Sequence, residues 1–144
     1  MTKLQRILFR TGAVACLLTA ALHLVGHLAG QPPPRNETEA ELRKLMTEYR
    51  ADVLGVPLTM QDLVSGFSLC YSLFLAWVGL VALLLVRRAG PERFMRSVAV
   101  LCALGAVALL AVSYRYFPLP PTICAAVIVL GFAGATIPGG KAPA

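Results

Sequence analysis

Residues 12–30 read GAVACLLTAALHLVGHLAG, and this stretch decides the fold. It is apolar apart from small or weakly polar residues and two histidines, His23 and His27, the only histidines in the chain. Small and polar residues recur in it at alternating steps of four and three: Gly12, Cys16, Thr19, His23, Gly26 and Gly30. That spacing follows one face of a helix, and about 20 such residues suffice to cross a bilayer. The stretch therefore predicts a membrane-spanning helix that carries a polar stripe.

The composition assigns the whole chain to the same class. Of its 144 residues, 58% are hydrophobic and 14% are charged, and the mean hydropathy is +0.74. A soluble domain of this size would expose too much apolar surface, so we expect an integral membrane protein. The net charge is +6, but Lys and Arg stand at the ends of apolar runs and form no continuous basic face. We therefore expect the lipid bilayer as a partner and no nucleic acid.

Apolar runs of membrane-spanning length indicate a single membrane domain, 1–144. We expect an all-α integral membrane fold in which four transmembrane helices form an antiparallel bundle. The predicted spans are 7–29, 63–86, 95–116 and 122–137. The apolar centres of the last two cover roughly 25 Å, which is less than a hydrocarbon core of about 30 Å. Flanking aromatic residues and a snorkelling Arg96 must therefore complete these spans.

Four glycines inside the spans favour close packing between helices. They are Gly12, Gly105, Gly131 and Gly134. Because a glycine has no side chain, each of them allows a neighbouring backbone to approach.

The distribution of Lys and Arg between the spans predicts the orientation. One side of the membrane receives eight of them: Lys3, Arg6, Arg10, Arg87, Arg88, Arg93, Arg96 and Lys141. The other side receives five: Arg35, Arg43, Lys44, Arg50 and Arg115. Since cytoplasmic loops carry the excess of positive charge, we expect a multi-pass protein of the bacterial inner membrane with both termini in the cytoplasm.

The only sizeable polar region lies between the first two predicted spans. Three prolines at 32–34 cannot continue a helix, and Asn36 after them is a good N-cap with Glu39 three residues on. Apolar residues at helical spacing then predict an extracytoplasmic amphipathic helix over 37–53. Its apolar side either lies on the outer leaflet or covers the mouth of the bundle, and the sequence leaves both open.

The second span begins with another polar stretch, QDLVSGFSLCYS at 61–72, in which Asp62 is the only carboxylate adjoining a span. When the first span ends and the second begins on the same side, His27 lies near the depth of Asp62, and His23 lies about 6 Å deeper. A carboxylate beside an imidazole favours its charged form and fixes its tautomer. The predicted ligand-binding residues are His23, His27, Asp62, Ser65, Ser68 and Arg115, and the only catalytic candidates are His27 and Asp62.

Three interpretations of these residues stay open. In the first, they only hydrogen-bond to a neighbouring helix, at about 0.6 kcal/mol each, and Arg115 pairs with Asp62 as a structural ion pair. The second is a site for a ligand or a proton. The third, a metal or haem site, lacks further ligands, because no CxxC or HExxH occurs and the four cysteines stand in four different spans. We expect no metal, no cofactor, and cysteines that pack as small apolar residues.

Two segments of the chain carry a resemblance to a known family. They read LFRTGAVACLLTAALHLVGHLAG and MQDLVSGFSLCYSLFLAWVGLVALLL. The matching motifs are Gly26-His27, which closes the first span, and Asp62 with Gly66-Phe67, which opens the second. Over residues 7–88 the chain resembles an uncharacterised family of small bacterial four-helix inner-membrane proteins, although the family's aromatic residues around the Asp are missing here. A looser similarity to DoxX-like proteins concerns topology only.

The sequence leads to one main functional expectation and one alternative. We expect a non-catalytic component that binds a lipid-like molecule or packs as an accessory subunit of a larger membrane complex, with a membrane-protein partner or a second copy of itself. The alternative is a membrane-embedded enzyme that acts on a hydrophobic substrate, with His27 as acid or base and Asp62 as its orienting partner. A cavity that reaches His23 or His27 would favour a ligand or enzyme site, whereas packing against a neighbouring helix would favour a subunit role.

Overall fold

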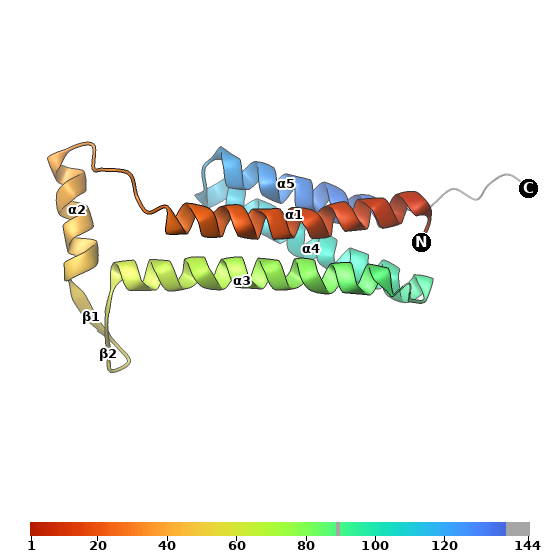
Figure 1. The fold of residues 1–144 in the computed structure, drawn as a ribbon, viewed down its shortest axis with the longest axis horizontal. Helices are drawn as coiled ribbons and strands as arrows, with labels where there is room; N and C mark the ends of the chain where they lie inside the picture. The colour runs from red at the N-terminus through yellow and green to blue at the C-terminus, as the bar shows by residue number, and fades with distance from the viewer. Residues whose placement is uncertain (89, 138–144) are drawn as a thin grey trace, which may run out of the picture.

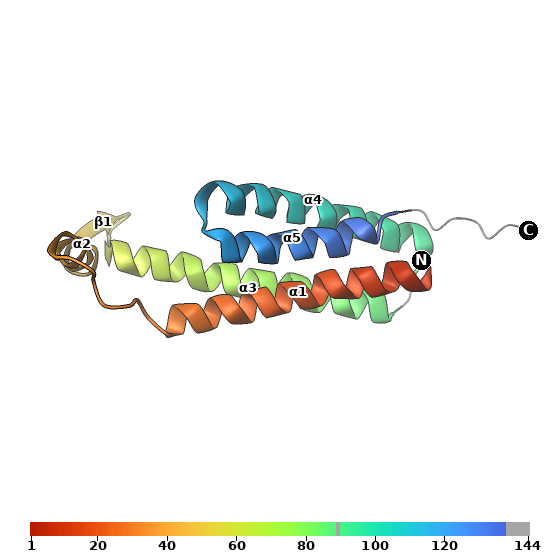
Figure 2. The ribbon, with the colours of Figure 1, turned by 90° about the horizontal axis from the view of Figure 1, so that it is seen from above.

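Long helices dominate the computed structural model, which describes residues 1–88 and 90–137 (Figure 1). The elements are α1 (Lys3–Leu28), α2 (Glu37–Glu48), β1 (Arg50–Val53), β2 (Val56–Thr59), α3 (Met60–Arg87), α4 (Glu92–Tyr116) and α5 (Leu119–Gly134). The four helices other than α2 run side by side in two layers, α1 with α3 and α4 with α5 (Figure 2). Lys141, which entered the count of basic residues, lies outside the described residues.

Three helices are long and apolar enough to cross a membrane. They are α1, α3 and α4, with 26, 28 and 25 residues. The fourth apolar helix, α5, has 16 residues, and at 1.5 Å per residue it is roughly 24 Å long. The structure therefore confirms a helical fold with spans of membrane length. The complete four-span bundle stays a prediction.

The helices begin earlier than the apolar runs predict, because the residues before those runs start the helices. Thr2 forms a capping box with Gln5, so α1 begins at Lys3 and not at residue 7. Thr59 forms the same motif with Asp62 at the start of α3. The last two helices likewise begin before the spans predicted at 95–116 and 122–137, since α4 covers 92–116 and α5 covers 119–134.

The prediction of one amphipathic helix over 37–53 is wrong over its last five residues, 49–53. After α2 the chain forms an antiparallel hairpin of β1 and β2, in which Arg50 lies opposite Thr59. The turn places Leu54 and Gly55 at φ angles of 56° and 83°, the left-handed region that glycine adopts without steric cost. The apolar residues of 49–53 fit a helical stripe and a short strand equally well, which is why the periodicity misled the prediction.

Helix α2 lies crosswise to α1 and α3, beyond the ends of both (Figure 1). Asn36 Oδ1 accepts a hydrogen bond from the Glu39 backbone N–H at 2.8 Å, which confirms the predicted N-cap. The Glu39 carboxylate accepts hydrogen bonds from the Arg35 backbone N–H and from the Arg43 guanidinium, and both hold the pKa of this carboxyl below its ordinary value. Because α2 lies crosswise to α1 and α3, it runs parallel to the membrane plane when those two helices span a bilayer.

Helix α1 is the centre of the packing. It contacts α3 on one side and α5 on another, while α4 packs against α5. Phe9 of α1 and Phe132 of α5 are almost fully buried and meet edge to face, with ring centroids 5.2 Å apart. Small side chains fill much of the remaining core: Ala13, Cys16, Ala20, Ala82, Ala99, Ala103, Ala106, Ala125 and Ala135. The helices can therefore approach closely.

Two glycines mark the points of closest approach. A Cβ atom on Gly131 would lie 2.4 Å from the backbone nitrogen of Gly12, so α5 and α1 meet there backbone to backbone. A Cβ atom on Gly79 would lie 2.8 Å from the carbonyl oxygen of Ala13, on the face of α1 toward α3. These contacts agree with the predicted packing role of Gly12 and Gly131. The same prediction for Gly105 is wrong, because a Cβ atom there would meet nothing within 4 Å.

Candidate functional site

The contact between antiparallel α1 and α3 brings part of the polar stripe of 12–30 together with part of the polar stretch 61–72. His23 Nε2 lies 2.8 Å from Ser68 Oγ, which is a hydrogen bond across the helix interface. The half-buried imidazole also meets the ring of Tyr71 edge-on, with ring centroids 4.8 Å apart and planes at 69°. Of the predicted site residues, the structure therefore joins His23 and Ser68 directly.

Other polar side chains near this contact bond within their own helices. The Ser72 hydroxyl donates to the carbonyl oxygen of Ser68 at 3.1 Å, and the Thr19 hydroxyl donates to the carbonyl oxygen of Ala15 at 2.8 Å. In the part of the chain that the structure describes, the bond between His23 and Ser68 is the only side-chain hydrogen bond that joins α1 to α3. It is therefore the specific polar contact of this interface.

The chemistry of this contact suits a link between helices. A neutral imidazole and a serine hydroxyl each contain a donor and an acceptor, so the bond forms in more than one arrangement of the protons. The ring of Tyr71 packs against the imidazole in a T-shaped arrangement. Between membrane helices such a bond contributes about 0.6 kcal/mol, with an upper value of about 1.7. The contact is therefore suited to fixing the register of α1 against α3.

Asp62 has a different role from the one predicted. Its Oδ2 atom accepts hydrogen bonds from the Thr59 backbone N–H at 3.0 Å and from the Thr59 hydroxyl at 2.8 Å. In return, the Asp62 backbone N–H donates to the Thr59 hydroxyl oxygen at 3.0 Å. Together these bonds form the capping box that starts α3. Within residues 1–88 and 90–137, no hydrogen bond or ion pair joins Asp62 to His27 or to Arg115, so neither predicted pair is formed.

The remaining predicted residues lie apart from the His23 contact. Ser65 accepts a hydrogen bond at 3.3 Å from the side-chain amide of Gln61, one turn earlier on α3. The Arg115 guanidinium stacks over the ring of its neighbour Tyr116, 5.4 Å from the ring centroid, at the C-terminal end of α4. His27 is half-buried near the end of α1. The six predicted residues therefore do not form a single cluster.

The register of α3 explains why Asp62 lies apart. The buried side of α3 recurs at alternating steps of three and four through Ser72, Leu75, Gly79, Ala82 and Val86. Continuing this pattern toward the start of the helix leads to Ser68, Ser65 and then Gln61. Asp62 lies about 100° around the helix from Gln61. The carboxylate is therefore turned away from the interface with α1. On that other side of the helix it is bound by Thr59, the residue before α3.

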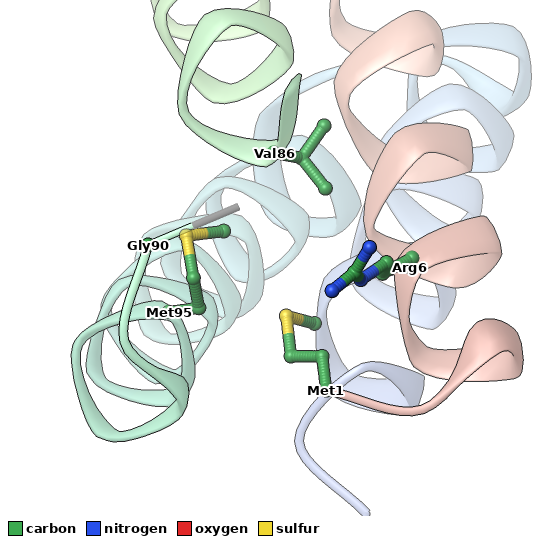
Figure 3. Close-up of a pocket in the computed structure, with 5 residues that line it drawn as sticks. All are labelled: Met1, Arg6, Val86, Gly90 and Met95. Atoms are coloured by element: carbon green, nitrogen blue, oxygen red, sulfur yellow. The ribbon is translucent and has the colours of Figure 1, made fainter. Parts of the chain in front are cut away.

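Two hollows lie toward the end of the bundle where α1 and α4 begin and α3 ends. One is a small cavity of about 10 Å³, which has room for about one water molecule (Figure 3). It is lined by Met1, Arg6, Val86, Gly90 and Met95. The second is an open groove on α4. The cavity is far smaller than the several hundred Å³ of a usual small-molecule pocket, and the groove is open and does not enclose a ligand. Neither hollow is lined by His23 or His27.

The side-chain chemistry available for metal ligation is sparse. Within the described ranges, no group of three or more His, Cys, Asp or Glu side chains could hold a metal ion. The four cysteines are free: Cys16 is buried, Cys102 and Cys124 are half-buried, and Cys70 is exposed. The candidate site consequently offers an imidazole, hydroxyl groups and aromatic edges.

Two residues of this region were missed in the sequence. Thr59 completes the capping box with Asp62, and the signature of a threonine followed three residues later by an acidic residue was available to find it. Tyr71 lies three residues after Ser68, close enough on the helix surface to reach the same imidazole. Because Tyr71 is aromatic, it was grouped with the apolar residues of α3 and not with the polar candidates.

Comparison of the chain with protein-family models, curated proteins and solved structures finds no match. The resemblance to the family of bacterial four-helix membrane proteins stays a prediction. The functional argument therefore rests on the fold and on the geometry of the contact around His23.

Proposed function

We propose that this chain is a four-span inner-membrane protein with both termini in the cytoplasm. Support for the fourth span comes from α5, which lies along α1 and α4 and meets the backbone of α1 at Gly131. Support for the orientation comes from the basic residues, because α1 begins and α3 ends at the same end of the bundle (Figure 1). Seven basic residues gather there: Lys3, Arg6, Arg10, Arg87, Arg88, Arg93 and Arg96. The excess of positive charge supports a cytoplasmic position for this end.

Within that membrane, we propose a non-catalytic role as a subunit that packs against another membrane protein. The observation that carries this proposal is the contact of His23 with Ser68 and Tyr71. A catalytic or ligand-binding imidazole faces a cavity, whereas this ring packs against a neighbouring helix and lines neither hollow described above. The alternative, a His and Asp acid–base pair acting on a hydrophobic substrate, has less support because Thr59 binds the Asp62 carboxylate.

The outer face of α3 supplies the surface for such a partner. Phe67, Phe74 and Trp77 are 76%, 75% and 66% exposed, and their spacing places them along one side of the helix. Trp77 lies roughly 15 Å from the basic end of α3, near the middle of a hydrocarbon core about 30 Å thick. Tryptophan normally prefers the membrane interfaces, where its indole N–H finds an acceptor. A protein partner would provide that acceptor at mid-depth, where lipid tails cannot.

Site-specific photo-cross-linking in native membranes tests this role. A photoreactive phenylalanine analogue replaces Phe74, and the matched control carries it at Leu104, which is exposed on α4. Both positions lie roughly 20 Å from the basic ends of their helices, so they sample the same depth. We expect one discrete protein adduct from position 74 and lipid adducts alone from position 104.

The mass of the adduct identifies the partner. An adduct of twice the chain mass would show that a second copy packs on α3, and a larger or smaller adduct would identify a different subunit for mass spectrometry. Both results support the proposal. Lipid adducts alone at position 74, or the same protein adduct at both positions, would contradict it.

A further inference from the structure

A groove on the outer face of α4 combines two kinds of chemistry. It is lined by Arg93, Arg96, Ser97, Val100 and Leu101, all within the first three turns of the helix. The first three of these residues present guanidinium and hydroxyl groups, and the last two present apolar side chains. The groove therefore changes from basic to apolar along the helix axis.

The position of the groove on α4 directs it away from the protein core. The buried residues of this helix are Met95, Ala99, Ala103, Ala106 and Ser113, which share the side toward the bundle. The groove residues lie on the opposite side, and Leu101 is 71% exposed. Helix α4 is long and apolar enough to span a membrane, and when it does so this side faces lipid.

Depth along α4 matches the two parts of the groove to the two parts of a phospholipid. Arg93 and Arg96 lie within roughly 6 Å of the start of the helix, at the level of the headgroups. Val100 and Leu101 lie roughly 12 Å from the start, among the acyl chains. Arginine binds phosphate oxygens through two parallel N–H donors, and a long side chain can extend to the headgroup level.

The charges around the groove favour an anionic headgroup. Five further basic side chains belong to the same end of the bundle: Lys3, Arg6, Arg10, Arg87 and Arg88. Glu92 begins the same helix, and its carboxylate forms an ion pair with the Met1 amine at 3.4 Å. The local field is therefore strongly positive, and basic residues near the surface attract anionic lipids.

We propose that this groove binds one anionic phospholipid, with its phosphate between Arg93 and Arg96 and an acyl chain along Val100 and Leu101. Ser97 lies beside the phosphate position, and its hydroxyl donates its one proton to the Arg93 carbonyl oxygen at 3.1 Å, so it bonds the phosphate only after rotating away from that carbonyl. A free phosphate ion would leave the apolar half of the groove empty, so the proposal commits to the lipid. It rests on α4 spanning the membrane and not on a partner at α3.

Fluorescence quenching by brominated lipids tests the proposal. Trp77 is the only tryptophan in the chain, so a Trp77→Phe background allows a single reporter, Leu101→Trp, to be placed in the groove. The matched control is Leu130→Trp, which is 71% exposed on α5 in the same leaflet, on a helix without charged residues. The protein is reconstituted in phosphatidylcholine bilayers that contain brominated phosphatidylglycerol or brominated phosphatidylcholine.

The expected result is a local preference for the anionic lipid. Quenching at position 101 should give a relative affinity for phosphatidylglycerol at least about threefold above that for phosphatidylcholine. The ratio at position 130 should be near one. Arg93→Gln with Arg96→Gln should bring the ratio at position 101 to about one, while Arg93→Lys with Arg96→Lys should keep part of it because the charge remains.

Three results would overturn the proposal. Equal ratios at positions 101 and 130 would show that the anionic lipid gathers around the whole basic end. The same loss after Arg87→Gln with Arg88→Gln would show that total charge decides the preference and not the groove. Displacement of the brominated lipid by millimolar inorganic phosphate would show a phosphate site without a lipid. Circular dichroism of each variant in detergent verifies that its helices form before the lipids are compared.

Discussion

Helix α1 contacts its neighbours in two different ways along its length. In the half that begins at Lys3, Gly12 and Ala13 let α5 and α3 approach the α1 backbone itself. In the half that ends at Leu28, the side chain of His23 reaches across to α3 and forms a single hydrogen bond. One half therefore lets neighbouring backbones approach at small residues, and the other connects to α3 through a polar side chain.

This difference distinguishes the contacts that stabilise the bundle from the polar residues that are conspicuous in its sequence. A close backbone approach cannot accept even one methyl group without moving a helix, which typically costs 1–3 kcal/mol and sometimes more. A hydrogen bond between membrane helices contributes about 0.6 kcal/mol. The polar residues of α1 are conspicuous because they are unusual in an apolar run, but the closest helix contacts are made at small residues.

The largest effect should come from adding a methyl group at the closest crossing. In Gly131→Ala the new Cβ would lie 2.4 and 2.5 Å from backbone atoms of Gly12, and no flexible side chain can yield there. We expect the free energy of unfolding to fall by about 3 kcal/mol, measured by denaturation in detergent micelles. Gly26→Ala is the matched control, because its Cβ would meet nothing within 4 Å. Equal effects of the two variants would contradict the packing of α1 against α5.

A smaller effect should come from the cap that starts α3. Thr59→Ala removes the hydroxyl that bonds the Asp62 backbone and carboxylate, which should cost about 1 kcal/mol. Amide hydrogen exchange in the first turns of α3 should become about fivefold faster. Thr47→Ala serves as the control, since the Thr47 hydroxyl only donates to carbonyl oxygens within α2. Unchanged exchange in Thr59→Ala would mean that α3 does not depend on this cap.

The sequence was sufficient to predict the features that depend on one segment at a time. Apolar length predicted the helices of membrane length, and Asn36 with Glu39 predicted the start of α2. The glycine pair Gly12 and Gly131 agreed with the structure because close crossings between membrane helices favour small residues at any register.

Features that depend on the relative rotation of two segments were not predictable in this way. Asp62 and His27 lie at similar depth, which made a pair plausible, but depth does not determine which way a side chain points around a helix. A shift of one residue turns a helix position by about 100°, and this shift separates Asp62 from the contact stripe. The hairpin of β1 and β2 was missed for a related reason. The apolar residues within 49–53 fit the spacing of a helix as well as that of a strand.

Two double-mutant cycles in detergent test most directly whether His23 connects α1 to α3. One cycle combines His23→Ala with Ser68→Ala, and the other combines His27→Ala with Asp62→Asn. Unfolding free energies should give a coupling of about 0.6 kcal/mol, and at most about 1.7, for the first pair. For the second pair the effects should add to within about 0.3 kcal/mol. Coupling between His27 and Asp62 together with additive effects of His23 and Ser68 would contradict the account.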